Sequence, residues 1–175
     1  GGTGGAPAGI AAARAGAKTV VLEMLHTLGG VGTAGLITKY WYGNRVGFTA
    51  ELDRIIMDRD AEARETAGRS WGPEMKAAAY AHLLHAAGGA ACMGSFAVGV
   101  RMEGDRVAGA LVSTPFGAGW LDAGCVVDAT GNADIAAAAG APCRVIGADH
   151  VAVQGTGLSP RVHPAVRYLN SCRGL

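Results

Sequence analysis

The sequence has few aromatic residues, no excess of either charge and no long apolar run. Aromatic residues make up 6% of the chain, and 15 basic residues against 14 acidic ones leave a formal charge of +1. The chain therefore lacks the basic block that typifies nucleic-acid or anionic-membrane binding. No apolar stretch approaches the roughly 20 residues of a membrane-spanning helix. We expect neither a nucleic-acid partner nor a membrane span.

Closely spaced cysteines are also absent. The four cysteines are far apart in the sequence: Cys92, Cys125, Cys143 and Cys172. They contain no C-x-x-C pair and no other metal-ligand spacing. We therefore expect buried free thiols in a reducing compartment, the cytoplasm, and no metal site. A redox-active disulfide is the alternative, although it normally uses cysteines close in the sequence.

Glycine is abundant, with 29 residues, and half of the chain is apolar, as in a tightly packed α/β domain. The first 23 residues carry glycines at a known spacing. With one glycine placed just before Gly1, Gly2 and Gly5 become the second and third glycines of G-x-G-x-x-G. This fingerprint marks a strand turning into a helix whose N-terminus faces a pyrophosphate. It predicts a dinucleotide-binding βαβ unit whose first strand precedes Gly1.

Each position of this motif has a physical role. At Gly2 a side chain would hold phosphates away from the backbone, and Gly5 and Gly9 allow close packing of the helix on the sheet. Gly16 suits the positive φ that ends a helix. A buried strand is predicted from Thr19 to Leu22, and Glu23 lies at its carboxyl end.

The Glu23 carboxylate could accept hydrogen bonds from both hydroxyls of an adenosine ribose, and it would repel a 2′-phosphate. The alternative is a packed Gly/Ala-rich helix followed by an exposed glutamate. The spacing of small residues, the apolar run and the terminal Glu23 together favour the nucleotide site.

A second glycine cluster follows, from Leu28 to Gly35. Its glycine content predicts a loop whose backbone closely approaches another group. We interpret it as a second backbone cradle, for the other half of a larger dinucleotide, with Thr33 able to donate to a phosphate or ring atom. A solvent-exposed loop is the alternative. Tyr40, Trp41 and Tyr42 come next and are assigned no role.

Two helical regions are expected in the middle of the chain. A surface helical insertion covers about residues 49–67, with Thr49 as N-cap and its charges facing water. A second helix begins at Pro73 and ends at Gly88. Its expected apolar side consists of Met75, Ala78, Ala79, His82, Leu83 and Ala86.

Short strands are then expected to form an antiparallel β-meander over about residues 91–123. The apolar run Cys125–Asp128 is expected to rejoin the parallel sheet. It leads into Ala129, Thr130 and Gly131, which place small residues where a cofactor passes close to the backbone. Asp134 is expected to cap the next helix or to bind a cofactor hydroxyl.

These three motifs, in this order, resemble the FAD-dependent oxidoreductase family of the glutathione-reductase-like superfamily, over Gly1 to about Pro142. The resemblance implies a Rossmann-like α/β FAD-binding domain with a parallel sheet and an inserted β-meander, incomplete at both ends. It implies FAD as cofactor, with its adenosine at Glu23, its pyrophosphate over the first glycines and its flavin end near Gly30 to Thr33. The implied cofactor residues are Gly2, Gly5, Ala6, Glu23, Gly29, Gly30, Thr33, Val98, Ala129, Thr130, Gly131 and Asp134.

Family members are longer than this chain. We therefore expect residues 1–144 to be a partial FAD-binding domain and residues 145–175 to begin a truncated substrate or cap region, with the catalytic residues lying outside the chain. The expected function is hydride transfer between a small organic substrate and FAD, with a separate electron donor or acceptor as a further partner. The alternatives are a flavin monooxygenase or halogenase, a non-catalytic nucleotide-binding or electron-transfer subunit, and an NAD-only domain.

Overall fold

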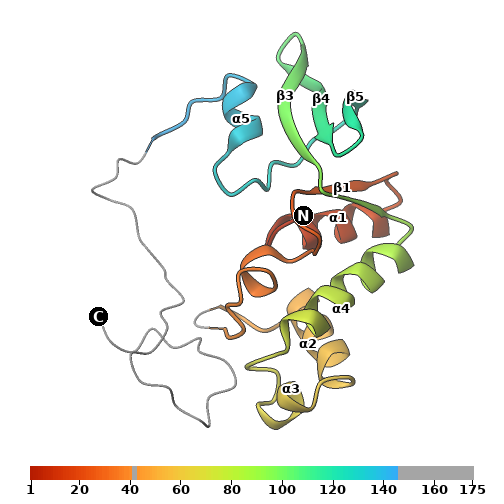
Figure 1. Ribbon diagram of the computed structural model, residues 1–175, viewed down its shortest axis with the longest axis vertical. Coiled ribbons are helices and arrows are strands. Elements are labelled where there is room, and N and C mark those ends of the chain that lie inside the picture. The colour runs from red at the N-terminus through yellow and green to blue at the C-terminus, as the bar shows by residue number, and fades with distance from the viewer. Residues whose placement is uncertain (41–42, 146–175) are drawn as a thin grey trace.

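The computed structural model describes residues 1–40 and 43–145. It has a two-stranded parallel sheet and a three-stranded antiparallel sheet (Figure 1). The strands are β1 (Val20–Glu23), β2 (Ala90–Met93), β3 (Phe96–Glu103), β4 (Arg106–Thr114) and β5 (Gly117–Asp122). The helices are α1 (Gly5–Arg14), the 3-10 turn η1 (Gly30–Gly32), α2 (Phe48–Met57), α3 (Ala61–Glu65), α4 (Pro73–Ala86) and α5 (Asp134–Ala138).

Helix α1 ends as its sequence predicts. The Gly16 N–H donates to the Ala13 carbonyl at 2.9 Å, and the Ala17 N–H donates to the Ala12 carbonyl at 3.1 Å. With Gly16 at a φ of +87°, these two bonds form a Schellman motif. The chain then turns directly into β1, so the helix-to-strand order of the predicted βαβ unit is confirmed.

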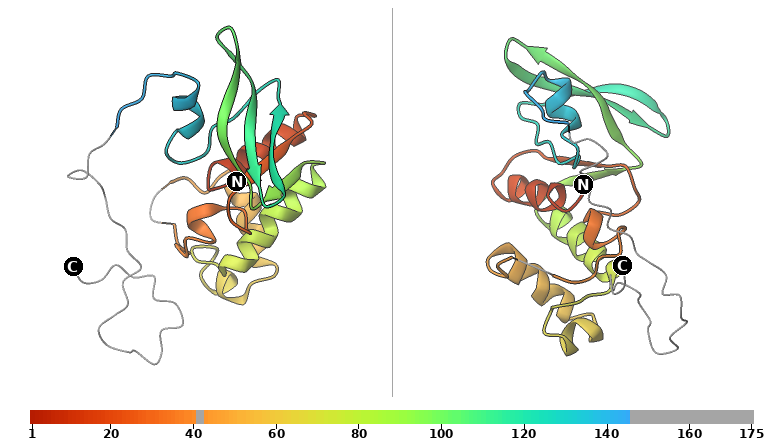
Figure 2. Two further views of the ribbon diagram at one scale, coloured as in Figure 1. Left: turned by 45° about the horizontal axis from the view of Figure 1, so that its top comes forward. Right: turned by 90° about the vertical axis from the view of Figure 1, so that its left-hand side faces the viewer.

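Helix α1 packs closely on β1 because Gly9 has no side chain. A Cβ atom built on Gly9 would overlap the Cγ2 atom of Val21, which is buried in the core. Helix α4 lies beside α1 and contacts β2, so the two helices support the parallel strands together (Figures 1 and 2). The core between them includes Ile10, Leu83 and Leu84.

The expected meander was wrong at its start, because β2 belongs to the other sheet. Residues 90–93 pair in parallel with β1, Val20 opposite Ala90 and Glu23 opposite Met93, so they belong to the parallel sheet. The antiparallel meander is limited to β3, β4 and β5. The four residues of β2 are too few for an alternation pattern to reveal their partner, which is set by the packing of α4.

The run Cys125–Asp128 does not form a strand. An isolated apolar segment becomes a strand only where a neighbour accepts and donates its backbone hydrogen bonds, and within residues 1–40 and 43–145 no strand is paired with it. The segment instead leads the chain from β5 to α5, which contacts β3 (Figure 1).

The helical insertion appears as α2 and α3, with two corrections. Helix α2 begins at Phe48 with Gly47 as N-cap, so Thr49 lies inside its first turn. Asp53 was expected to face water but is only 3% exposed. Its carboxylate is covered by Tyr40 and Arg45, which lie outside the helix and both donate to it.

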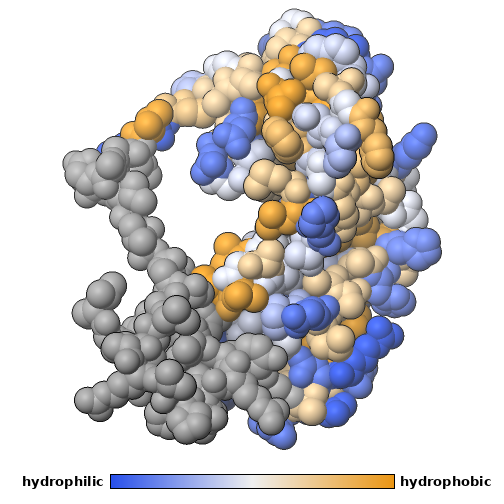
Figure 3. Space-filling model, viewed as in Figure 1, coloured by the Kyte–Doolittle hydropathy of each residue, from blue (hydrophilic) through white to orange (hydrophobic). Residues whose placement is uncertain are grey.

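The antiparallel sheet leaves apolar side chains on the surface. Hydrophobic groups gather at the upper end of the molecule, where β3 lies (Figure 3). The exposed large apolar residues of this sheet and its turns include Phe96, Val98, Phe116 and Trp120. In the part of the chain that the structure describes, no helix combines the length and apolarity that crossing a bilayer requires.

Candidate functional site

The N-terminus of α1 lies against the second glycine cluster. The Gly29 N–H donates to the Gly1 carbonyl at 2.9 Å, and the Thr3 hydroxyl donates to the Gly29 carbonyl at 3.2 Å. A Cβ atom built on Gly30 would stand 2.9 Å from the Gly2 Cα atom. The two backbones therefore touch, and only glycine fits at Gly30.

Ala129, which follows the antiparallel sheet, also lies against the N-terminus of α1. A Cβ atom on Gly5 would lie 3.1 Å from the Ala129 Cβ atom, and one on Gly2 would lie 4.0 Å from the Ala129 carbonyl oxygen. Gly5 therefore makes room for Ala129, whereas the expectation was that it makes room for the sheet. Three segments that are far apart in the sequence converge here.

The helix end that these segments surround is not capped by a side chain. Gly4 is the N-cap residue of α1 and makes no side-chain cap bond, and the first turn contains no acidic residue. The first N–H groups of an α-helix lack intrahelical acceptors, and the helix dipole makes this end positive. Gly5 and Ala6, in the first turn, are buried. The Ala6 N–H already donates to the Gly2 carbonyl at 3.0 Å. The helix dipole and the N–H groups that have no acceptor suit a phosphate group.

Glu23 is placed at the carboxyl end of β1 and is 8% exposed. Its Oε1 atom accepts the Leu25 N–H at 2.8 Å, and its Oε2 atom lies 3.3 Å from the amino group of Gly1. Each carboxylate oxygen has two lone pairs, so these contacts leave acceptor capacity for two further hydroxyl donors.

Thr33 is placed differently from the expectation. Its side chain is 2% exposed, and its hydroxyl donates to the Leu28 carbonyl at 2.7 Å. A hydroxyl has one hydrogen, so in this arrangement Thr33 cannot donate to a phosphate or ring atom. The bond instead closes the turn that contains η1 and helps to hold Gly29 at a φ of +103°.

The N-terminal end of α5 is held by the side chains of Asp128 and Thr130, which the sequence analysis did not assign to this role. Asp128 accepts the Thr130 N–H at 2.9 Å, the Thr130 hydroxyl at 2.8 Å and the Ala136 N–H at 2.8 Å. The Thr130 hydroxyl in turn accepts the Asp134 N–H at 2.9 Å. Burial alone raises the pKa of Asp128, but these hydrogen bonds outweigh burial and hold the pKa below its usual value.

The Asp134 side chain is therefore not the cap of α5. Asp134 is exposed, and the structure shows the capping role shared by Asp128 and Thr130. An aspartate followed by threonine two residues later is a known turn signal, which could have identified this cap. The Asp134 carboxylate is left at the surface.

Val98 lies on β3 at a β-bulge. Ala97 pairs with Val112 and Gly99 with Leu111, so Val98 is the additional residue between them. Its side chain is 53% exposed. Helix α5 contacts the same strand (Figure 1).

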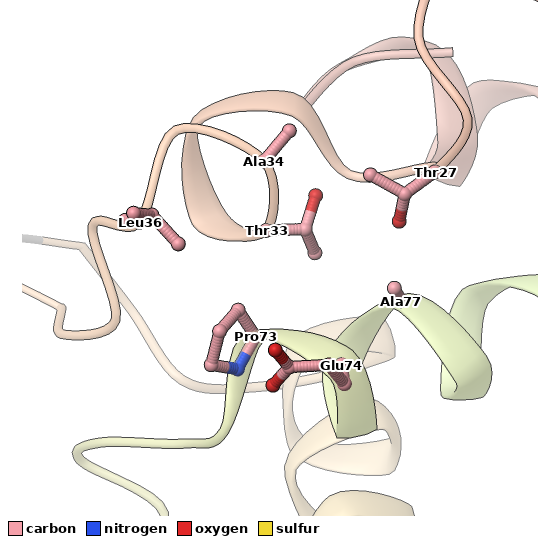
Figure 4. Close-up of a pocket in the computed structure, with 7 residues that line it drawn as sticks. All are labelled: Thr27, Thr33, Ala34, Leu36, Pro73, Glu74 and Ala77. Carbon is pink, nitrogen blue, oxygen red and sulfur yellow. The ribbon is translucent and has the colours of Figure 1, made fainter.

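A pocket of about 310 Å³ adjoins the second glycine cluster (Figure 4). Thr33, Thr27 and the chain after η1 form one wall, and the first turns of α4 form the other. The lining residues are Thr27, Thr33, Ala34, Leu36, Pro73, Glu74 and Ala77. Glu74 is the one ionisable residue among them, so the pocket is mainly apolar.

The sequence analysis did not predict that Lys76 of α4 is buried. Lys76 was left out of the expected apolar side of α4, yet it is 5% exposed. Four residues that were expected on that side are exposed: Met75, Ala78, His82 and Ala86. The residues that α4 buries are Pro73, Lys76, Ala79, Tyr80, Leu83 and Leu84. Their spacing of three and four residues is itself helical, so the signal was present in the pattern 76, 79, 80 and 83.

The cysteines and histidines offer no site in the part of the chain that the structure describes. Cys92, Cys125 and Cys143 are free thiols, but Cys92 is only half-buried and the other two are exposed, so the expectation of buried thiols was wrong for all three. Cys172 lies outside the described residues. Cys125 is exposed because its segment forms no strand. No group of three His, Cys, Asp or Glu side chains within residues 1–40 and 43–145 could hold a metal ion.

Comparison with known proteins shows the family and the fold of the chain. The model of the family described as FAD dependent oxidoreductase matches residues 1–168. The crystal structure of Thermovibrio ammonificans THI4 is similar with a TM-score of 0.51 and 18% identity, over 78% of this chain and 58% of that one. This likeness shows a shared fold, and this chain spans just over half the length of THI4.

Two further structures show weaker similarity. BexE has a TM-score of 0.42 at 22% identity, over 70% of this chain and 28% of its own. CabE, an aromatic hydroxylase from angucycline biosynthesis, has a TM-score of 0.38 at 16% identity, over 69% of this chain and 28% of its own. Comparison with curated protein sequences gave no match.

Proposed function

The chain belongs to the family of FAD-dependent oxidoreductases, whose cofactor is FAD, and from this premise we propose that it transfers a hydride between a small organic substrate and FAD. The observation that carries the proposal is the convergence of three backbones at the open end of α1. Gly2, Gly30 and Ala129 come from separate segments. A Cβ atom built on Gly30 would stand 2.9 Å from the Gly2 Cα atom, and one built on Gly5 would stand 3.1 Å from the Ala129 Cβ atom. A cofactor crossing this junction would meet main-chain atoms.

The residues present fit FAD. The uncapped N-terminus of α1, with Gly2, Gly5 and Ala6, would bind the pyrophosphate through the helix dipole and through backbone N–H groups other than that of Ala6, which donates to the Gly2 carbonyl. Glu23, with free acceptor capacity at the end of β1, would bind the ribose hydroxyls. When bound, FAD supplies a ring system that accepts or gives a hydride, and the protein positions it and tunes its electronic properties.

The other residues that we expect to contact the cofactor come from the second glycine cluster, the Ala129–Gly131 corner, β3 and α5. Gly29 and Gly30 would form the cradle for the flavin end, with Thr33 closing their turn through the Leu28 carbonyl. The corner of Ala129, Thr130 and Gly131 would pass beside the adenosine and pyrophosphate. We also include Val98, at its bulge, for the adenine and Asp134 for a cofactor hydroxyl.

The pocket beside Thr33 is our candidate for the substrate. It shares the segment of Gly30 and Thr33 with the proposed flavin end, its walls are mainly apolar, and Glu74 is its one ionisable group. Such a lining suits a small apolar molecule. The expected substrate or cap region at residues 145–175 falls almost wholly outside the described residues, so the substrate itself is left open.

The experiment is cofactor loading followed by reduction. The purified chain is mixed with FAD or with NAD, separated from free nucleotide and examined by absorbance. We expect retained flavin and no retained NAD. Retention of NAD alone would replace the proposal with the NAD-only alternative. Flavin that no candidate substrate bleaches under anaerobic conditions would indicate an electron-transfer or nucleotide-binding subunit.

A monooxygenase would be recognised by its reaction with oxygen. Flavin reduced by a nicotinamide nucleotide, with oxygen consumed only when an organic substrate is present, would favour that alternative over hydride transfer from the substrate. A cytoplasmic location and a separate electron donor or acceptor belong to the proposal as well.

A further inference from the structure

Lys76 is a buried cation held by aromatic rings. Its Nζ atom lies 3.4 Å from the centroid of the Trp71 ring and 4.7 Å from that of the Tyr40 ring. It also lies 3.4 Å from the Tyr40 hydroxyl. A desolvated ammonium group over an aromatic face is attracted by the ring quadrupole, which partly replaces the lost water.

The surroundings of Lys76 carry a net positive charge. Asp53 of α2 accepts the Tyr40 hydroxyl at 2.8 Å and the Arg45 Nε–H at 2.8 Å, so its charge is already balanced by Arg45. Within residues 1–40 and 43–145, Lys76 forms no ion pair. The cluster of Tyr40, Arg45, Asp53 and Lys76 therefore contains one more positive charge than negative.

This cluster is joined to η1. The Trp71 indole N–H donates to the Gly32 carbonyl at 2.8 Å. A Cβ atom built on Gly32 would lie 3.5 Å from the Lys76 Nζ atom and 3.6 Å from the Trp71 ring. The cation is thus packed directly against the turn that continues from Gly30, with no layer of solvent or side chain between them.

We propose that Lys76 is the positively charged group behind the Gly30–Thr33 turn, and that it raises the reduction potential of a flavin bound against that turn. The inference rests on the proposed function, because it takes the turn to be the flavin end of the site. Lys76 acts through the turn, so it is a positioning and electrostatic residue and does not touch the reacting atoms.

The charge change on reduction gives the reason. An oxidised flavin that accepts a hydride from an organic donor, two electrons and one proton in total, becomes an anion with one more negative charge. A nearby buried cation lowers the free energy of that anion more than it affects the neutral oxidised ring. Its field is strong because protein, and not water, fills the space around Lys76.

The effect should depend on pH. Burial lowers the pKa of Lys76 to about 8, while the Asp53 carboxylate acts in the opposite direction. The groups that face it are Tyr40 from the loop, Asp53 from α2, Arg45 beyond Asp53 and Tyr80 from its own helix. Burial raises the pKa of both tyrosines, to about 12 for Tyr80, so neither ionises in this range.

The test is an electrode titration of the FAD-loaded chain from about pH 6 to about pH 10. In the wild-type chain, reduction should make Lys76 bind its proton more tightly. The potential should therefore fall more steeply with pH above about pH 8, where oxidised protein has lost that proton and reduced protein retains it. The variant K76M should have a more negative potential than wild type at low pH and should lack this steeper region.

Two further variants complete the design. K76R keeps the charge and should stay near the wild-type potential at low pH without the steeper region, because arginine does not titrate there. K18M removes an exposed lysine of the same chain and should leave the curve unchanged. If K76M does not fold, the wild-type curve alone tests the role of Lys76. Its steeper region requires a group that takes up a proton when the flavin is reduced.

The two proposals fail differently. Failure of the chain to retain FAD would overturn the proposed function and this inference with it. Retention of FAD with equal potentials for K76M and wild type, or a wild-type curve of constant slope throughout, would overturn the role of Lys76 and leave the proposed function standing.

Discussion

Gly2 and Gly30 are in backbone contact, although 27 residues lie between them in the sequence. A Cβ atom on Gly30 would stand 2.9 Å from the Gly2 Cα atom and 3.0 Å from the Thr3 nitrogen, and Gly30 has a φ of +56°. A backbone cannot give way as a flexible side chain can. The contact therefore depends on glycine at position 30, and it joins the two halves of the proposed cofactor site.

The variant G30A should lose FAD. An alanine in the left-handed region costs roughly 1–2 kcal/mol, and the clash with Gly2 and Thr3 would move η1 away from α1. Flavin retained after gel filtration is the measurement, and a large loss is expected while the circular dichroism of the helices is kept. G119A is the control, because Gly119 of β5 has a negative φ and nothing within 4 Å of its Cβ position. Full flavin content in G30A would contradict the proposed role of Gly30 in the flavin cradle.

The contact of Gly9 with Val21 predicts a defect in folding. A methyl group at Gly9 would overlap the Val21 Cγ2 atom, and valine has little rotamer freedom with which to move away. The free energy of unfolding of G9A should fall by about 1–3 kcal/mol. Denaturant unfolding measures this change.

A double mutant tests the cause. In V21A the clashing methyl groups are removed, so G9A/V21A should be less destabilised than the sum of the single changes, with a coupling of about 0.5–3 kcal/mol. G4A is the matched control, since Gly4 has a φ of −89° and open space around it. Simple additivity of G9A and V21A would show that the two residues do not meet in this way.

The sequence sufficed for features that depend on local chemistry. The glycines of α1, its end at Gly16 and the strand leading to Glu23 follow from backbone freedom and a short apolar run, and the structure has each of them. These positions are determined by neighbours within a few residues, which is why a pattern could reveal them.

Features that depend on distant neighbours were not predicted. The parallel partner of β1, the absence of a strand at 125–128 and the burial of Asp53 are set by elements far away in the sequence. Lys76 is the clearest case, because the rings that hold it come from residues 40 and 71. A lysine on a helix is ordinarily expected in water, and only tertiary contacts show otherwise.

Glu23 gives a prediction for cofactor affinity. Its carboxylate has acceptor capacity left after binding the Leu25 N–H, and hydrogen bonds to a charged acceptor contribute about 1.5–3 kcal/mol each. The variant E23A should therefore bind FAD at least about tenfold more weakly, as measured by fluorescence titration. E65A, which removes an exposed glutamate of α3, should bind as wild type does. Unchanged affinity in E23A would remove Glu23 from the site.

Asp128 gives a prediction for stability against pH. Its pKa in the folded chain is lowered, so its contribution is fully present above its unfolded pKa of about 3.9 and is lost as the pH falls through the folded value. At neutral pH, D128N should lower the stability of the α5 end by about 1 kcal/mol, a modest amount because the site is largely open to water. Amide hydrogen exchange at Thr130 and Ala136 measures this local change.

The difference between D128N and wild type should shrink in acid, because the wild-type carboxyl group then becomes protonated as well and loses the charge that strengthens its three accepted hydrogen bonds. D105N is the matched control, since Asp105 lies exposed in the turn between β3 and β4. Its exchange rates should match wild type at every pH. A D128N difference that persists unchanged in acid would show that the shape of the side chain, and not its charge, holds α5 in place.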